Sequence, residues 1–295
     1  MANKGKKSLV ESLKFNSYAD MVSGDDKAVS EVPLKDLHDF KDHPFKVNDD
    51  TEDMRELVES IRQNGVLTAG TVRLRPEGGY EIISGHRRKR ACELAGLETM
   101  PVFIVALDDD EAVIRMVDAN LQREEILPSE KAHAYRMKYD AMKHRGCRDE
   151  DREKGKTVDL IGSAAGESGK TVQRYICLSN LSDLLLDMVD RKKLPLMSGV
   201  EISFLREPEQ EWVFQRIAES GISATPAQGA KLREHSKEGD LSEGMVKLIL
   251  SDEKPKPRRF VMKADRISEY FPEEMTEEEI EKTIYQLLEQ WKKQR

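Results

Sequence analysis

Apolar residues between residues 32 and 146 follow two alternating patterns, one typical of short β-strands and one typical of amphipathic helices. Short apolar segments bounded by polar or glycine residues predict strands at residues 72–74, 80–83 and 102–105. Apolar positions three and four residues apart predict helices over residues 53–63, 86–95, 111–121 and 128–145. Val32-Pro33-Leu34 is expected to lead into a loop. Strands that alternate with helices predict a small α/β domain.

After a charged connection at residues 148–156, the pattern predicts helices alone. The run Lys254-Pro255-Lys256-Pro257-Arg258-Arg259 predicts a stiff, extended hinge. Beyond it, Thr276 and Glu279 predict a capping box at the start of a last helix. That helix carries one apolar stripe, formed by Ile280, Ile284, Leu287, Leu288 and Trp291. The stripe needs a partner, and both a second copy of the chain and the nearby Phe260, Val261, Tyr270 and Phe271 remain open as its partner.

Together the patterns predict an α+β multidomain protein. The expected parts are a flexible basic tail at residues 1–30, the small α/β domain at residues 31–125, an all-helical domain at residues 126–235, a helix and Pro/Lys linker at residues 236–259, and a helical dimerisation segment at residues 260–295.

Composition narrows the class of protein. Only 38% of the 295 residues are hydrophobic and 35% are charged, which favours an elongated, helix-rich protein. The net charge is −8, so anion binding must come from local cationic patches. Cys92, Cys147 and Cys177 are odd in number and far apart, which argues against a disulfide framework or zinc site and for a reducing cytoplasm. No apolar stretch approaches membrane-spanning length and no signal peptide is apparent, so we expect an intracellular protein.

The segment Ser84-Gly85-His86-Arg87-Arg88-Lys89-Arg90 places a glycine and four cations directly after a predicted strand. Gly85 permits a tight turn, and a helix then begins at His86. Basic side chains would therefore meet the unpaired N–H groups and the positive dipole end of a helix, an arrangement that binds phosphate. For the cluster taken alone, a solvated basic face on a surface helix is the alternative. His38 and His43 lie among aspartates, but their spacing matches no metal site.

Residues 161–176 have the spacing of a helix-turn-helix. Gly162 would let two helices approach, Gly166 would turn the chain, and Val172 would pack the second helix inward. The residues that would then meet DNA are Ser168, which also caps the helix, Lys170, Thr171, Gln173 and Arg174. An ordinary helical hairpin is the alternative. The same stretch ends like an ATP-binding P-loop, but Ala164 replaces the required first glycine and the preceding residues are helical in pattern, so we reject that reading.

Three motifs follow one another before this helix pair, at residues 85–91, 120–124 and 127–132. In this order and separation they resemble the ParB/Noc family of chromosome and plasmid partition proteins, over roughly Val32 to Leu205, with a tail closer to the plasmid or mobile-element branch. The resemblance implies a ParB-like N-terminal domain that binds CTP and Mg²⁺ and a central domain that grips a palindromic, parS-like site. It implies CTP contacts at Gly65, Thr68, Ser84, Gly85, His86, Arg87, Arg88, Asn120 and Arg123, with Mg²⁺ at Asn120.

Two positions depart from that family's pattern. His86 and Ala119 stand where the family usually has glutamates, and a carboxylate there would help to hold magnesium or orient the attacking water. Asp118 could compensate, although on a helix its side chain points about 100° away from that of its neighbour. Thr68-Ala69-Gly70 also lacks the proline that is common in that loop. We therefore expect CTP binding and only weak hydrolysis, if any.

The expected function is that of a DNA-binding, homodimeric partition protein, a CTP-controlled clamp in the bacterial cytoplasm on nucleoid or plasmid DNA. The resemblance also implies that the tail at residues 4–14 contacts a ParA-type ATPase. A transcriptional regulator with the same DNA grip is an alternative. A ParB-fold nuclease would need clustered carboxylates, and none is evident near the phosphate motif. A sulfiredoxin-like reductase would need a thiolate there, whereas Cys92 lies further along the helix.

Overall fold

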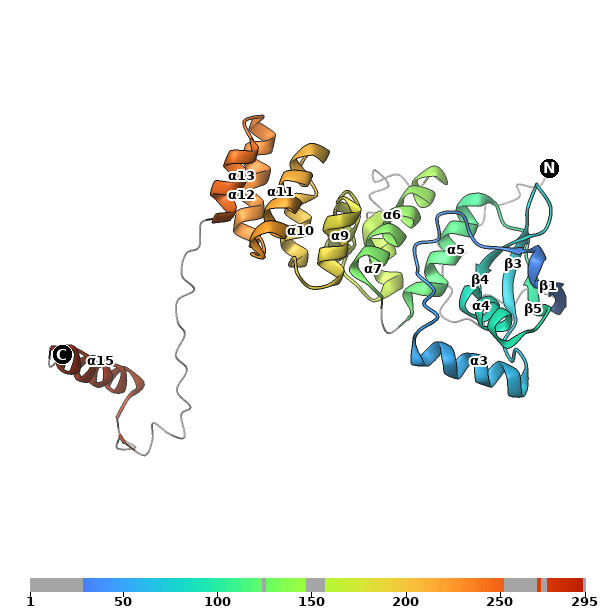
Figure 1. Ribbon diagram of the computed structural model, residues 1–295, viewed down its shortest axis with the longest axis horizontal. Coiled ribbons are helices and arrows are strands. Elements are labelled where there is room, and N and C mark those ends of the chain that lie inside the picture. Colours follow the sequence, from blue (N-terminus) through green and yellow to red (C-terminus); the bar gives the residue numbers. More distant parts are fainter. Residues whose placement is uncertain (1–28, 124–125, 147–156, 252–269, 272–274, 294–295) are drawn as a thin grey trace, which may run out of the picture. The chain divides into compact units, whose positions relative to one another are not determined.

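The computed structural model describes residues 29–123, 126–146, 157–251, 270–271 and 275–293, without the side chains of Glu277, Leu288 and Lys293 (Figure 1). It separates into two units, Met1–Ser251 and Asp252–Arg295. Predictions for residues 1–28 of the basic tail, Cys147, the connection at residues 148–156, the hinge at residues 254–259, and Phe260 and Val261 lie outside the described residues, whereas Val29 and Ser30 of the expected tail belong to a strand.

A mixed five-stranded sheet forms the centre of the N-terminal part, in the order β1-β5-β3-β4-β2. Its strands are β1 (Val29–Pro33), β2 (Leu37–His38), β3 (Gly70–Leu74), β4 (Tyr80–Ser84) and β5 (Thr99–Ile104). The β1–β5 and β3–β4 pairs are antiparallel, and the β3–β5 and β2–β4 pairs are parallel. The three predicted strands are confirmed.

The sequence analysis did not predict a strand around Val32, where the structure has β1. Only Val32 is buried in this edge strand, so its sequence shows no clear alternation. A short 3₁₀ turn, η1 (Leu34–Asp36), then leads into the two-residue β2, which exists only through its pairing with Tyr80 and Glu81. Long-range pairing of this kind leaves no local signal in the sequence.

Both faces of the sheet are covered. Ile82 lies in a core with α3 (Glu52–Asn64) and α4 (His86–Ala95), whereas its neighbour Ile83 lies in a second core with α5 (Asp109–Leu121). Successive side chains of a strand point to opposite faces, so a strand covered on both sides is a continuous apolar run. The predicted helix over residues 53–63 is α3, which begins at a cap that the sequence analysis did not identify: the Thr51 hydroxyl accepts from the N–H of Met54 at 3.3 Å, and Gly65 ends the helix with φ 68°.

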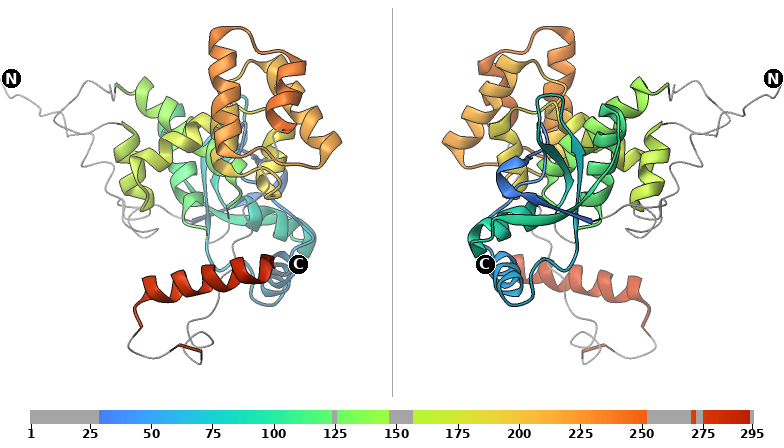
Figure 2. Two further views of the ribbon diagram at one scale, coloured as in Figure 1. Left: turned by 90° about the vertical axis from the view of Figure 1, so that its left-hand side faces the viewer. Right: turned by 90° about the vertical axis from the view of Figure 1, so that its right-hand side faces the viewer.

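Helices follow one another without a strand through the described residues 126–146 and 157–251 (Figures 1 and 2). They are α6 (Pro128–His144), α7 (Thr157–Ala165), α8 (Gly169–Leu178), α9 (Asp183–Asp190), α10 (Leu196–Ile202), α11 (Glu207–Ser220), α12 (Pro226–Glu238) and α13 (Glu243–Ser251). One face of α6 lies in the core, because Ala132, Tyr135 and Met142 are buried. Helix α6 packs against α5, α7, α8 and α9, and so joins the sheet part to the helical part.

The second unit contains α15 (Glu277–Lys293). Its predicted capping box is confirmed, because the Glu279 carboxylate accepts from the Thr276 N–H at 3.0 Å and the Thr276 hydroxyl accepts from the Glu279 N–H at 3.4 Å. Leu287 and Trp291 of the apolar stripe are more than half exposed. Among the described residues, no helix has both the length and the apolar character needed to cross a bilayer.

Candidate functional site

A cavity of about 940 Å³ lies where α3, α4 and α5 meet the ends of α6 and α7. This volume is at the upper end of the range for small-molecule sites. Eight of the nine residues predicted to hold a nucleotide line it, namely Thr68, Ser84, Gly85, His86, Arg87, Arg88, Asn120 and Arg123. Gly65 does not line it and serves instead to end α3. The fold thus brings together two motifs that are more than thirty residues apart in the chain.

The first turn of α4 opens into this cavity. Gly85 precedes the helix with φ 118° and ψ 14°, a backbone conformation that residues with a Cβ rarely adopt. A Cβ at Gly85 would also lie 3.3 Å from the Cα of Gly70 on β3. No side chain caps this end and no acidic residue occupies the first turn, so the unpaired N–H groups there are offered to a ligand. Together with the helix dipole, they form an anion site.

Arg87 and Arg123 bring two positive charges to this end of the cavity. Burial lowers the pKa of Arg123 below its ordinary value, the charge of Arg87 lowers it further, and Glu130 opposes this shift. Among the residues that the structure describes, no carboxylate forms an ion pair with either guanidinium. Two like charges held together in this way favour an anion between them, and guanidinium groups suit phosphate oxygens.

The resemblance implies that Arg88 contacts CTP, but in the structure its side chain forms hydrogen bonds within the protein. Its Nη1 donates to the backbone carbonyls of Thr68 and Ala69 at 2.5 and 2.7 Å. Its guanidinium therefore ties α4 to the stretch before β3 and shapes the cavity wall, because hydrogen bonds from a charged donor to carbonyls are strong.

The His86 side chain is turned into the protein and is 5% exposed. Its Nε2 accepts a hydrogen bond from the backbone N–H of Phe40 at 3.3 Å, and its ring lies 3.7 Å from the ring of His43. Burial is the main cause that lowers the pKa of His86 to about 3, with the nearby His43 as the next cause. His86 is therefore neutral near pH 7, so its ring supplies neither charge nor a carboxylate to a ligand.

The second motif lies on the last turn of α5. Asn120 is buried, and its Nδ2 donates to the Met116 carbonyl at 2.8 Å, which leaves the amide oxygen for a ligand. Ala119 also lines the cavity and offers no polar group. Asp118 lines it too, but its carboxylate forms an ion pair with Lys138, whose side chain is buried. Asp118 is thus neutralised by a lysine, which weakens the idea that it replaces the missing acid.

Sequence reasoning missed the part of the wall formed by α3, where Asp53, Glu56 and Ser60 line the cavity. Their spacing of three and four residues marks one helix face, which is the signal that could have identified them. With Glu111 and Asp118, they bring four carboxylates to the cavity, whereas the sequence suggested no such cluster. Glu111 is already paired with Arg115 at 2.8 Å.

Helices α7 and α8 are joined by a three-residue turn. A Cβ at Gly162 would lie 2.6 Å from the carbonyl oxygen of Glu167, so only glycine allows this approach, and Gly166 has φ 70°. The Ser168 hydroxyl accepts from the N–H of Thr171 at 3.1 Å, and Val172 is fully buried.

The predicted DNA-facing side chains lie on the other side of α8. Lys170, Gln173 and Arg174 are exposed and Thr171 is partly exposed. No strand precedes this turn, because α7 does, which agrees with rejection of a P-loop.

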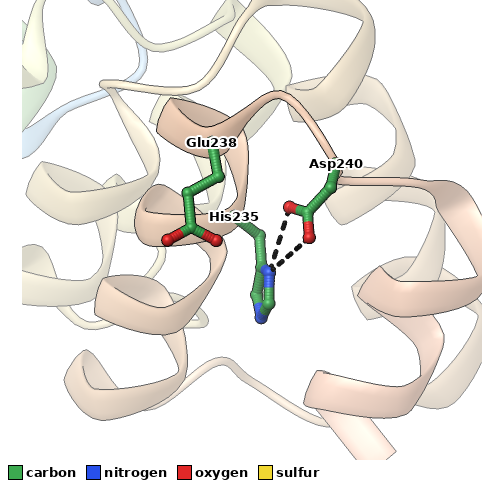
Figure 3. A group of neighbouring side chains, drawn as sticks. All are labelled: His235, Glu238 and Asp240. Atoms are coloured by element: carbon green, nitrogen blue, oxygen red, sulfur yellow. Dashed lines mark hydrogen bonds and ion pairs between the residues drawn. The ribbon is translucent and has the colours of Figure 1, made fainter.

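A separate group of possible metal ligands lies at the end of α12, where His235, Glu238 and Asp240 come together (Figure 3). His235 Nδ1 lies 3.1 Å from a carboxylate oxygen of Asp240. Glu238 and Asp240 are exposed. The hydrogen bond between imidazole and carboxylate, at the negative end of a helix, accounts for this group without a metal ion.

Comparisons with known proteins find matches for the N-terminal part of the chain. Residues 18–121 match the ParB N-terminal domain family. Over 180 residues, 61% of this chain and 58% of the relative, the chain is 32% identical to the probable chromosome 1-partitioning protein ParB of Deinococcus radiodurans. Over 183 residues, 62% of each chain, it is 30% identical to the chromosome-partitioning protein Spo0J of Thermus thermophilus. It therefore spans about three fifths of the length of these relatives.

A solved structure of the C-terminally truncated chromosome-partitioning protein ParB from Caulobacter crescentus, complexed with CTP-gamma-S, is 27% identical to this chain. The match covers 65% of this chain and 99% of that chain, with a TM-score of 0.31.

Proposed function

We propose, from the match of residues 18–121 to the ParB N-terminal domain family and from the similarity to chromosome-partitioning proteins, that this chain is a sequence-specific DNA-binding partition protein controlled by CTP. The observation that supports this most is the meeting of Arg87, Arg123 and the first turn of α4 in one cavity. These groups form a phosphate site, and the cavity volume accommodates a nucleotide.

In this proposal the triphosphate lies at the α4 end of the cavity. Arg87 and Arg123 neutralise its charge, and the N–H groups that follow Gly85 bind its oxygens. Asn120 offers an amide oxygen to Mg²⁺, a hard cation that prefers oxygen ligands. The cytosine faces the stretch at Thr68, which Arg88 holds in place. Mg²⁺ held by Asn120 would supply positive charge that offsets the charge of the triphosphate.

We further propose that the cavity binds CTP more effectively than it hydrolyses it. Hydrolysis needs a group that orients the attacking water. His86 is buried away from such a role, Ala119 has no polar group, and Asp118 is paired with Lys138. Any remaining carboxylate for that role comes from Asp53 or Glu56 on α3.

The proposed DNA interface is α8 as the recognition helix of a helix-turn-helix. Its exposed face carries Lys170, Thr171, Gln173 and Arg174, which suit phosphate and base-edge contacts. Ser168 holds the helix start. A palindromic site requires two copies of this helix, and α15 offers an exposed apolar stripe for a homodimer.

The cellular setting is also part of the proposal. We place the protein in the bacterial cytoplasm, on nucleoid or plasmid DNA, and assign contact with a ParA-type ATPase to the tail at residues 4–14. A transcriptional regulator would bind DNA through the same helix-turn-helix. Stimulation of a cognate ParA-type ATPase by a peptide of residues 1–30 supports partition, and no stimulation supports the regulator.

The test is nucleotide binding and phosphate release by the full-length protein with Mg²⁺, with and without DNA fragments from its own genome. Binding of CTP in preference to ATP, GTP and UTP, with little phosphate release, is the expected result. Absence of CTP binding both with and without DNA overturns the nucleotide part of the proposal. Failure to enrich any DNA fragment overturns the DNA part.

A further inference from the structure

Four aromatic or guanidinium groups form a continuous series beside the phosphate site. His86 stacks on His43 with ring centroids 3.7 Å apart. His43 meets Phe45 edge to face at 5.6 Å, and the guanidinium carbon of Arg123 lies 5.4 Å from the centre of the Phe45 ring. The series connects the start of α4 to Arg123, the second residue after α5.

The loop that carries His43 and Phe45 is fastened at both ends. At one end the Phe40 N–H donates to His86, and at the other the Lys46 N–H donates to the Glu130 carboxylate at 2.8 Å. Phe40 and Phe45 are themselves buried against α5. The loop therefore has little freedom, and the ring of Phe45 is a fixed surface beneath Arg123.

Arg123 needs such a support. Its charge lies near that of Arg87, which repels it, and burial also disfavours its charged form. Among the described residues, no carboxylate holds it in an ion pair. The face of Phe45 is the contact that the structure does provide, since the electron-rich face of an aromatic ring attracts a cation.

We infer that the stack of His43 and His86 is a positioning element of the phosphate site, because it fixes Phe45 and thereby holds Arg123 beside Arg87. This inference rests on the proposed role of the cavity in binding a triphosphate. It assigns His86 a role without ligand contact. The ParB/Noc family usually has an acid at this position, whereas the ring of His86 contacts His43 inside the protein and so helps to position Arg123.

The test is a double-mutant cycle on affinity for a triphosphate, with His43→Ala, Arg123→Ala and the double variant. Isothermal titration calorimetry with CTP and with inorganic tripolyphosphate gives the dissociation constants, and thermal denaturation checks that each variant is folded. We expect His43→Ala to weaken binding about tenfold when Arg123 is present and less than twofold when it is absent. Equal weakening in both backgrounds overturns the inference.

Three further variants keep the test decisive. His43→Phe retains a ring for the stack and should restore most of the affinity lost in His43→Ala; a failure to do so in a folded protein contradicts the inference. If His43→Ala does not fold, Phe45→Leu takes its place in the cycle, because leucine fills the core and lacks the aromatic face. His144→Ala, on the exposed end of α6, is the matched histidine control.

The two probes separate this inference from the proposed function. Coupling seen with tripolyphosphate in a protein that does not bind CTP supports the inference and overturns the nucleotide assignment. CTP binding with additive effects of the two substitutions overturns the inference and supports the assignment. Failure of both probes to bind overturns both.

Discussion

The Nε2 atom of His86 accepts a hydrogen bond from the backbone N–H of Phe40, at a distance of 3.3 Å. Protonation of that nitrogen would remove the acceptor and place a charge in a buried site. Burial is the main cause that lowers the pKa of His86 to about 3 and that of His43 to about 4. Asp39 favours the protonated forms, whereas Arg123 opposes them for both histidines and Lys89 opposes them for His86.

The first prediction concerns pH and stability. Both histidines take up a proton in the unfolded chain near their ordinary pKa of 6.5 but stay neutral in the folded chain down to about pH 4. The free energy of unfolding should therefore fall as pH decreases from 6.5 to 4, by up to about 1.4 kcal/mol per pH unit for each histidine. Urea unfolding at pH 7.5, 6, 5 and 4.5 measures this slope. In His43→Phe this slope should be smaller by about 1.4 kcal/mol per pH unit, the contribution of one histidine. An unchanged slope would show that His43 does not take up a proton on unfolding in this pH range.

The second prediction compares His86 and Ala119, the two positions where the resemblance to the ParB/Noc family leads us to expect glutamates. His86→Glu should destabilise the protein by on the order of 3 kcal/mol, because it buries an unpaired carboxylate, and should not raise CTP hydrolysis. Ala119→Glu places its carboxylate in the cavity and should raise phosphate release with little change in stability. Thermal denaturation and phosphate release measured on both variants provide the comparison. Increased hydrolysis in His86→Glu would contradict the buried role of residue 86.

The third prediction concerns the pair of arginines. Arg87→Ala should weaken triphosphate binding roughly tenfold to a hundredfold, since a hydrogen bond to a charged group contributes about 1.5–3 kcal/mol. Without ligand, the same variant should be at least as stable as the parent, because the repulsion of Arg123 is removed. Titration calorimetry and thermal denaturation test the two parts. Arg136→Ala, an exposed arginine paired with Asp140 on α6, is the control and should change neither.

The fourth prediction concerns α8. Arg174→Ala should abolish discrimination between a selected DNA site and a scrambled duplex at moderate salt, with a loss of about 1–3 kcal/mol for the specific site. Its exposed position means that the fold should be unaffected. Fluorescence anisotropy with both duplexes measures the ratio. Arg62→Ala on α3 is the control, and retained discrimination in Arg174→Ala would remove α8 as the recognition helix.

The fifth prediction concerns α15. Leu287 and Trp291 are more than half exposed, although they lie on the apolar stripe of the helix. If a second copy covers the stripe, Leu287→Glu should convert a dimer to a monomer in sedimentation velocity, because it places a charge in an apolar contact. Gln286→Glu, an equivalent charge on an exposed residue, is the control. A monomeric parent protein would favour packing within the second unit instead.

Much of the fold was predictable from local patterns. The amphipathic stripe of α3, its end at Gly65 and the start of α4 at His86 were evident because each depends on residues within one or two turns. The strand β2 was not, because it is stabilised only by pairing with Tyr80 and Glu81, more than forty residues away. The carboxylates of Asp53 and Glu56 were missed for the same reason, since only packing places their helix face on the cavity.

The sequence by itself determined that Gly85 and Arg87 belong to a motif suited to phosphate, because glycine turns, helix starts and guanidinium groups carry that chemistry wherever they occur, and the resemblance to the ParB/Noc family added Arg123. Only the tertiary structure decided which side chains are available to a ligand. Arg88 is bound to the carbonyls of Thr68 and Ala69, and His86 is stacked on His43 inside the protein. The direction in which a side chain points depends on distant neighbours that compete for its polar atoms, and sequence spacing does not encode that competition.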